Sequence, residues 1–438
     1  MSDTGRVPIE QSDGRSRDNG RVASAHAARD GTEPKRLLVL GAGPAQLGLL
    51  ETARRRGLTV VAADRDPAAP GLGRADRRAI VSIEDEPAVE RLARAENVHG
   101  LVAPGTDHAV AIAARVAARL GLPHPLDPET ALLAASKRRQ RERLTEAGVP
   151  QPRSLLCRTL EEVLAAADEL GYPCVLEAPD RAGERGVALA SDRDAVAGAA
   201  AEAVAASRND FCLVEELVGG RIVTVTGFAF EGRLAVLTLT DREQARPPAF
   251  GVPLLHTWPA ALEPGEEEAV VRLAAAAAAA LGVGSGPVSA QVRLAPQGPL
   301  LAKLSARTGG GHDSELCRAA TGVDLDDLAI ASALGEPVEE EHVRPLGLVG
   351  GACVRFLTAP PGELGETRGL EAARAVPGVR AVGAYRAPGH RFGVLRRASD
   401  RAGAVLATGA GRAEAEAAAA EAAALVEFVV TQRAKAPA

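Results

Sequence analysis

The chain has 438 residues, of which 46% are hydrophobic, 25% are charged and 2% are aromatic, and its formal net charge is −6. This length exceeds what a single hydrophobic core supports, and it predicts about two to four domains. A weakly acidic chain with so few aromatic side chains offers neither a basic surface nor stacking platforms. The composition therefore argues against a nucleic acid partner.

Three further features of the sequence narrow the class of protein. Residues 1–34 are rich in Arg, Asp, Gly and Ser and contain no apolar stretch of signal-peptide length, so they predict a disordered tail. The longest low-complexity run, Ala274 to Ala280, is too short to span a bilayer, and no membrane role is expected. The five cysteines are scattered and never in Cys-x-x-Cys spacing, which predicts buried free thiols in a cytoplasmic protein.

The segment after the tail alternates short apolar strands with helical stretches. This alternation predicts a Rossmann-like, doubly wound parallel sheet, and hence an α/β part at the start of the chain. The expected strands are Arg36 to Leu40, Thr59 to Asp64, Ala79 to Val81 and Gly100 to Val102, with a helical stretch between each pair.

A glycine-rich turn follows the first strand. Gly41 and Gly43, with Asp64 about twenty residues later, match part of a dinucleotide-binding fingerprint, but its third glycine position holds Gln46. A tight strand-to-helix turn explains the two glycines without any ligand. Binding of NAD at this turn is kept as an alternative function.

The middle of the chain predicts a compact α+β region and then a hairpin. A helix holds Ser136 and Lys137, and Tyr172 to Ala178 is expected to be a strand. Later, residues 289–294 and 300–307 flank a Pro-Gln-Gly turn and predict a β-hairpin, which is followed by the glycine loop 309–311.

In this order, these segments resemble the ATP-grasp family. Residues 171–187 look like its phosphate-covering loop, residues 214–220 look like its adenine hinge, and residues 361–403 are similar to the C-terminal part of ATP-grasp amino-acid ligases that make dipeptides. The resemblance implies a Rossmann-like domain at 35–127, an ATP-grasp domain at 128–345 with a smaller lid at about 137–217, and a C-terminal lobe at 346–438.

The resemblance also implies roles for individual residues. Lys137 would contact nucleotide phosphates, and Arg307 would stabilise an acyl-phosphate, since its planar fork matches two oxygens. The remaining positions carried over are Glu215, Glu216 and Val218 at the adenine hinge, and Gly310, Gly311 and His312 at the acyl substrate.

Departures from the family pattern gather where chemistry would take place. Glu177 stands at the second phosphate-binding lysine, and Arg221 stands at the acid after the hinge. The three metal-ligand positions hold Gln291, Lys303 and Ser305. Because Mg²⁺ prefers carboxylate oxygens, no metal-binding residues are assigned and Mg²⁺ is expected to bind weakly or not at all, whereas the binding of ATP is left open.

The exchanged charges lead to two expectations. Glu177 and Lys303 are expected to pair across the cleft, because a buried charge is costly unless it is paired. Alternatively, the ammonium group of Lys303 takes over part of the lost metal charge. Geometry decides between them.

The sequence therefore predicts a degenerate relative of ATP-dependent carboxylate–amine ligases that acts as a binding, regulatory or assembly partner. Its expected partners are a nucleotide, an amino acid or other small carboxylate, and a second copy or another protein. The main alternative is an active ligase that forms an amide or peptide bond through an acyl-phosphate and uses displaced acids. The candidates for those acids are Glu215, Glu216, Asp313 and Glu315.

Overall fold

A computed structural model describes residues 33–181, 183 and 185–431 of the chain. The predicted disordered tail lies outside these residues, apart from its last two positions. The five cysteines are buried and free, as predicted. Within the described part of the chain, no helix is long and apolar enough to cross a membrane.

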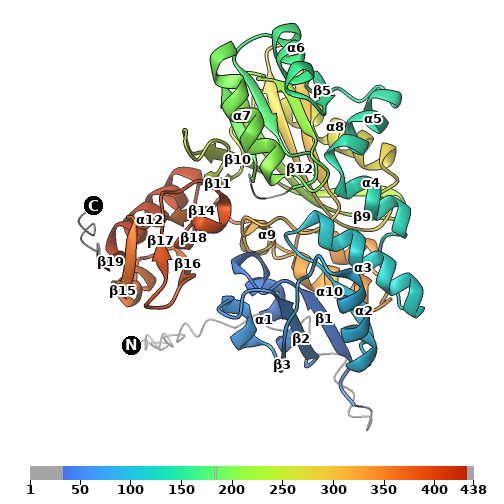
Figure 1. Ribbon diagram of the computed structural model, residues 1–438. Helices are drawn as coiled ribbons and strands as arrows, with labels where there is room; N and C mark the ends of the chain where they lie inside the picture. The colour runs from blue at the N-terminus through green and yellow to red at the C-terminus, as the bar shows by residue number, and fades with distance from the viewer. Residues whose placement is uncertain (1–32, 182, 184, 432–438) are drawn as a thin grey trace, which may run out of the picture. The chain divides into compact units, whose positions relative to one another are not determined.

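The first sheet is parallel, with strand order β3-β2-β1-β4, and confirms the predicted Rossmann-like start (Figure 1). One predicted helical stretch is wrong: the connection from β2 to β3 is the 3₁₀ turn η2 (Pro70–Arg74), whose proline and two glycines disfavour an α-helix. The other elements are β1 (Arg36–Leu40), α1 (Leu47–Arg55), β2 (Thr59–Asp64), β3 (Arg77–Ile80), α2 (Glu86–Ala95), β4 (Gly100–Val102) and α3 (Asp107–Leu120).

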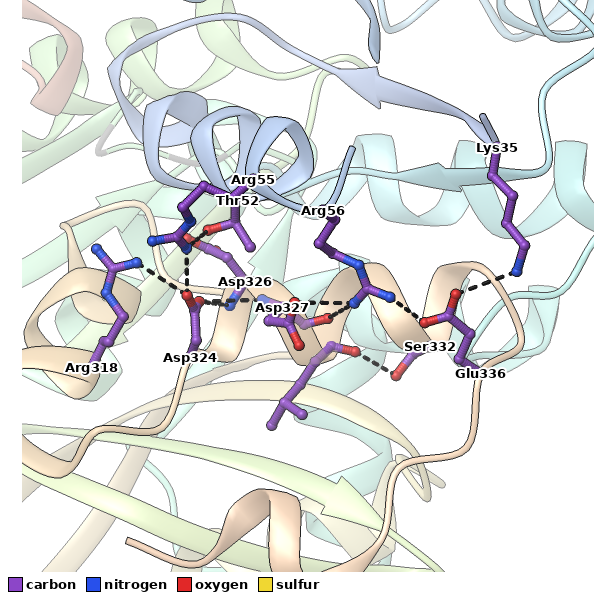
Figure 2. Close-up of polar contacts among 11 residues, drawn as sticks. Lys35, Thr52, Arg55, Arg56, Arg318, Asp324, Asp326, Asp327, Ser332 and Glu336 are labelled. Atoms are coloured by element: carbon purple, nitrogen blue, oxygen red, sulfur yellow. Dashed lines mark hydrogen bonds and ion pairs between the residues drawn. The ribbon is translucent and has the colours of Figure 1, made fainter. Parts of the chain in front are cut away.

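A helix from much later in the chain completes the core of this sheet. Helix α10 (Leu325–Ala333) buries Ile330 and Ala333 in the same cluster as Leu37 and Val39 of β1. Ion pairs reinforce the contact where α1 faces α10, as Figure 2 shows. Arg55 lies 2.8 Å from Asp324, and Arg56 lies 3.1 Å from Asp327.

A second, antiparallel sheet has the strand order β5-β8-β6-β7 and lies within the range predicted as the lid, about 137–217; we call it the lid sheet. The segment expected as a strand around residues 172–178 is β6. The elements from residue 128 to residue 216 are α4 (Pro128–Ala135), α5 (Lys137–Glu146), β5 (Ser154–Cys157), α6 (Leu160–Leu170), β6 (Cys174–Glu177), β7 (Val187–Ala190), α7 (Arg193–Ala206) and β8 (Cys212–Glu216). Apolar residues of α6 and α7 pack against the strands in one buried cluster.

The largest sheet has eight strands in the order β13-β12-β9-β10-β11-β14-β18-β16. It contains the predicted hairpin as β12 and β13. Its elements are β9 (Arg221–Phe230), β10 (Arg233–Gln244), β11 (Pro253–Trp258), α8 (Glu266–Ala280), β12 (Gly286–Ala295), β13 (Gly298–Ser305), α9 (Asp313–Thr321), β14 (Gly351–Leu357), β16 (Val379–Ala384) and β18 (Gly403–Gly409). Because β11 pairs with β14, the sheet runs across the domain boundary predicted at residue 345. The domain ranges stay a prediction.

The C-terminal part adds a small sheet in the order β17-β15-β19. Helix α12 contacts β18 and β14 and buries its alanine face in the cluster that holds Val405. The elements are β15 (Gly362–Arg368), α11 (Leu370–Arg374), β17 (Arg391–Phe392), α12 (Arg412–Leu425) and β19 (Glu427–Thr431).

Candidate functional site

Lys303 and Arg307 share one carboxylate from the N-terminal sheet region. Lys303 Nζ lies 2.6 Å from Asp107 Oδ2, and Arg307 Nε lies 2.6 Å from Asp107 Oδ1. Asp107 is the first residue of α3 and is buried. Burial alone would raise the pKa of Asp107, but the charges of Arg307 and Lys303 outweigh it and hold that pKa well below its usual range.

The residues at the positions where the resemblance expects metal ligands supply no carboxylate. Gln291 lies directly opposite Lys303 in the β12–β13 ladder, and Ser305 follows two positions along the same strand. An amide, an ammonium and a hydroxyl supply no carboxylate, and the ammonium repels a dication. In the part of the chain that the structure describes, no group of three His, Cys, Asp or Glu side chains is arranged to hold a metal ion.

A second cluster of buried charges surrounds Lys137, at the start of α5. Its Nζ lies 2.7 Å from Glu215 Oε2 on β8 and also pairs with Glu177 on β6. Arg141, one turn further along α5, donates from Nε to Glu215 Oε1 at 2.7 Å and from its other nitrogens to carbonyl oxygens of β13. These contacts join α5, the lid sheet and the large sheet through the chain's own charges.

The two carboxylates of this cluster differ in their pKa. For Glu215, the charges of Lys137 and Arg141 outweigh burial and lower the pKa. For Glu177, burial raises the pKa, and the nearby charge of Glu215 adds to this effect against the opposing charge of Lys137. Glu215 is therefore the carboxylate that anchors the cluster.

The expected pair between Glu177 and Lys303 is wrong. Glu177 pairs with Lys137, and Lys303 pairs with Asp107. Among the described residues, no ion pair joins Glu177 to Lys303. The physical reason is that each of these two charges has a closer partner on another element. That partner offsets the free-energy cost of burying the charge.

The hinge residues are held by the lid sheet. Glu216 extends the β5–β8 ladder: its N–H donates to the carbonyl of Arg153 at 3.1 Å, and its Oε1 accepts from the N–H of Arg153 at 2.8 Å. Val218 is buried just after β8. Arg221, at the position of the family's acid, pairs with Asp241 and Glu266, so its charge is taken up outside the two clusters.

The glycine loop 309–311 fits closely against a buried histidine and its carboxylate partner. A Cβ at Gly309 would lie 1.6 Å from Asp313 Oδ2, and a Cβ at Gly311 would lie 2.7 Å from His256 Cε1. Only glycine fits at these two positions. Gly310 faces Ala45 and the backbone of Gly105, so the loop lies beside the N-terminal turn.

His256 was not singled out by the sequence. Its Nδ1 lies 2.8 Å from Asp313 Oδ1, and its Nε2 is buried with no hydrogen-bond partner among the described residues. Burial lowers the pKa of His256 and outweighs the opposing effect of Asp313. A neutral ring that donates from Nδ1 presents Nε2 as an acceptor.

His312, expected at the acyl substrate, contacts two side chains of the chain itself, and its role at the substrate stays a prediction. Its Nδ1 lies 2.9 Å from Glu315 Oε1, and its Nε2 lies 2.5 Å from the hydroxyl of Tyr385. Both ring nitrogens are therefore engaged within the chain. The displaced acids expected for an active ligase are engaged as well, because Asp313 pairs with His256 and Glu315 pairs with His312.

The glycine turn after β1 is filled by its own side chains. The carboxylate of Asp64 accepts from the N–H of Ala42 at 2.9 Å, and Gln46 packs against Gly41 while donating to the carbonyl of Pro104. Both residues therefore serve the turn itself. The geometry favours the structural explanation of Gly41 and Gly43 over a dinucleotide site.

Two of the residues that build the site could have been noticed in the sequence. Asp107 follows a glycine turn at the carboxyl end of β4, the edge where parallel sheets place functional groups. Arg141 lies one turn after Lys137 on the same helix face. His256, within the apolar strand β11, carries no such signal.

Comparisons with known proteins agree with this architecture. A family model described as "Carbamoyl-phosphate synthase L chain, ATP binding domain" matches residues 136–341, and one described as "L-amino acid ligase C-terminal domain 2" matches residues 355–431. The crystal structure of L-amino acid ligase from Bacillus licheniformis superposes with a TM-score of 0.77 at 22% identity, covering 92% of this chain and 100% of that one.

Two proteins of similar sequence add to this comparison. The uncharacterized protein y4rH of Sinorhizobium fredii is 30% identical over 333 residues, which cover 74% of this chain and 67% of that protein. Carnosine synthase 1 of Gallus gallus is 30% identical over 339 residues, but the match spans only 36% of its length. Together with the matched family models, these relatives show that the chain belongs to the ATP-grasp superfamily and carries a C-terminal lobe of the L-amino acid ligase type.

Proposed function

We propose that this chain is a degenerate ATP-grasp protein that binds a small carboxylate, such as an amino acid, and does not activate it with Mg²⁺-ATP. One observation carries the proposal: the cations that the family resemblance assigns to phosphates and acyl-phosphate are paired with carboxylates of the chain itself. Lys137 is paired with Glu177 and Glu215, and Arg307 is paired with Asp107.

The charge balance of the two clusters supports this conclusion. Four cations, two in each cluster, face three carboxylates, so the net charge is +1 when all are ionised. A polyphosphate therefore meets cations whose charge is largely balanced by carboxylates of the chain itself. In addition, transfer of a phosphoryl group depends on divalent ions that neutralise its charge, and the family's metal positions supply no carboxylate here.

The site also retains groups suited to a small acid. The glycine loop closes against His256, whose buried Nε2 is an unpaired acceptor that suits an ammonium or amide N–H. Arg307 keeps a second nitrogen, Nη2, without a partner in the described part of the chain. An amino acid offers both complementary groups.

An active amide-forming ligase is the second candidate. It is favoured by the retained Arg307 and by the buried His256–Asp313 pair, which offers an acceptor nitrogen suited to an amine. This function requires Lys137 and Arg307 to exchange their carboxylate partners for nucleotide oxygens. The two candidates therefore differ in whether ADP is released.

The deciding experiment measures ADP release by the purified full chain with Mg²⁺-ATP and the common amino acids, singly and in pairs. We expect no release above the protein-free rate, and we expect titration calorimetry to show that Mg²⁺ does not strengthen ATP binding. An amino-acid-dependent, Mg²⁺-dependent release of ADP would establish the ligase instead. Sedimentation in the same buffer tests whether a second copy is a partner, because a homodimer would appear at twice the mass of one chain.

A further inference from the structure

The misfit at the metal positions points to a binding site of another kind. On strand β13, Leu304 is fully buried in the core, so its neighbours Lys303 and Ser305 project from the opposite face of the sheet. Gln291 lies across the ladder from Lys303. A cation and two neutral polar groups therefore occupy the face where the family places its metal ligands.

Asp107 fixes the two cations without neutralising both. Each of its oxygens receives one of them, at 2.6 Å in both cases, so one negative charge balances two positive charges. The side chain of Asp107 is 6% exposed, whereas those of Lys303 and Arg307 are 23% and 11% exposed. The carboxylate is thus enclosed, and the cations keep access to solvent.

Both cations retain donors after these contacts. Lys303 has three N–H bonds and uses one of them on Asp107. Arg307 uses Nε on Asp107 and one terminal nitrogen on the carbonyl of Thr308, which leaves Nη2 without a partner among the described residues. An ammonium beside a guanidinium with spare donors is an arrangement that binds the oxygens of an anion.

We propose that Lys303 is a built-in replacement for the metal ion, and that Lys303 and Arg307 form a metal-independent site for a single oxyanion, either a phosphate or a carboxylate group. Asp107 is the positioning residue that holds both cations toward the ligand. The net charge of +1 suits one oxyanion group and does not suit a polyphosphate. This inference rests on the proposed function, because it assigns the group that the site binds in place of Mg²⁺-ATP.

The test titrates the full chain with inorganic phosphate and, separately, with acetate, at constant ionic strength and with a chelator present. We expect saturable binding of at least one anion without Mg²⁺. Preference for phosphate assigns the site to a phosphoryl group, and preference for acetate assigns it to a carboxylate. Absence of binding by both anions, or binding that requires Mg²⁺, overturns the inference.

Variants then locate the site. Lys303→Met should weaken binding by roughly tenfold or more, because it removes a charge-assisted donor, and Lys303→Arg should restore most of the affinity. Lys35→Met is the matched control, since Lys35 is also a lysine in an ion pair, with Glu336, but belongs to neither charge cluster (Figure 2). Unchanged affinity in Lys303→Met overturns the assignment.

The result of the anion titration can be told apart from the result of the ADP-release assay that tests the proposed function. If the chain releases no ADP and binds neither anion, the anion site is wrong, whereas the absence of Mg²⁺-ATP activation that the proposed function states is upheld. If it releases ADP with Mg²⁺ and amino acids, the proposed function is wrong whatever the anions do. Should Lys303→Met fail to fold, the comparison of wild-type titrations with and without Mg²⁺ still decides the question.

Discussion

Lys303 Nζ lies 2.6 Å from Asp107 Oδ2, although the two residues are 196 positions apart in the chain. This contact ties the end of β13 to the start of α3. Arg307 binds the other oxygen of the same carboxylate. Asp107 therefore controls both the stability of the site and the position of its two cations.

Replacement of Asp107 by Asn should destabilise the protein strongly. The change leaves two cations side by side without a counter-charge, and removal of one partner from a buried ion pair costs about 3 kcal/mol or more. Urea unfolding measures the loss. Glu142→Gln is the control: Glu142 forms an exposed ion pair with Arg138 within α5, and its loss should cost less than about 1 kcal/mol. Equal losses in the two variants would contradict the buried role of Asp107.

The same carboxylate predicts a pH dependence. The pKa of Asp107 is lower in the folded protein than its ordinary value of 3.8. Its ion pairs therefore stabilise the fold above that value, and the stabilisation is lost as the pH falls below it. The difference in unfolding free energy between wild type and Asp107→Asn should be constant from about pH 7 to about pH 5 and should shrink below about pH 4. A difference that grows toward acid pH would rule out this origin.

The fold was predictable wherever the signal is local. Apolar strands such as Thr59–Asp64 and the hairpin that ends at Ser305 were predicted correctly, because burial imposes a regular pattern on adjacent residues. The connection after β2 was predicted to be helical, yet Pro70 and two glycines make it a 3₁₀ turn. The use of α10 to complete the N-terminal core leaves no local trace, since it depends on contacts between distant segments.

The candidate site was predictable in its residues and not in its pairings. The replacement of the family's lysine and metal ligands at Glu177 and Lys303 is visible in the sequence. Their partners are not, because Lys137, Glu215 and Asp107 are brought together by three different elements. Spacing along a chain indicates neighbours only within one helix or one ladder.

Gly311→Ala should disturb the glycine loop 309–311. The new methyl group would lie 2.7 Å from Cε1 of the buried His256 ring, which has no room to move away because Asp313 holds it. Overpacking of this kind costs about 1 to 3 kcal/mol. Gly198→Ala is the matched control: Gly198 lies within helix α7, and a Cβ there would meet no neighbouring atom within 4 Å, so alanine should be neutral or slightly stabilising.

Calorimetry with amino acids adds a second readout for Gly311→Ala. If the loop binds the small acid, this variant should lose affinity, and Gly198→Ala should bind as the wild type does. A variant that melts like the wild type and binds normally would show that the loop is looser than its contacts indicate.

The last prediction concerns the partner of Glu177. Glu177→Lys should destabilise the protein by about 3 kcal/mol, because it places a third cation beside Lys137 and Arg141 with only Glu215 to balance them. Adding Lys137→Glu exchanges the two charges and should recover about 1 to 3 kcal/mol of that loss.

A second double variant, Glu177→Lys with Lys303→Glu, tests whether Lys303 is the partner of Glu177. Lys303 pairs with Asp107 and not with Glu177, so combining Lys303→Glu with Glu177→Lys should give additive losses. Urea unfolding of the single and double variants completes the measurement. Recovery of stability by Lys303→Glu, with none by Lys137→Glu, would mean that Glu177 faces Lys303 across the cleft in solution and that the two charge clusters are not separate.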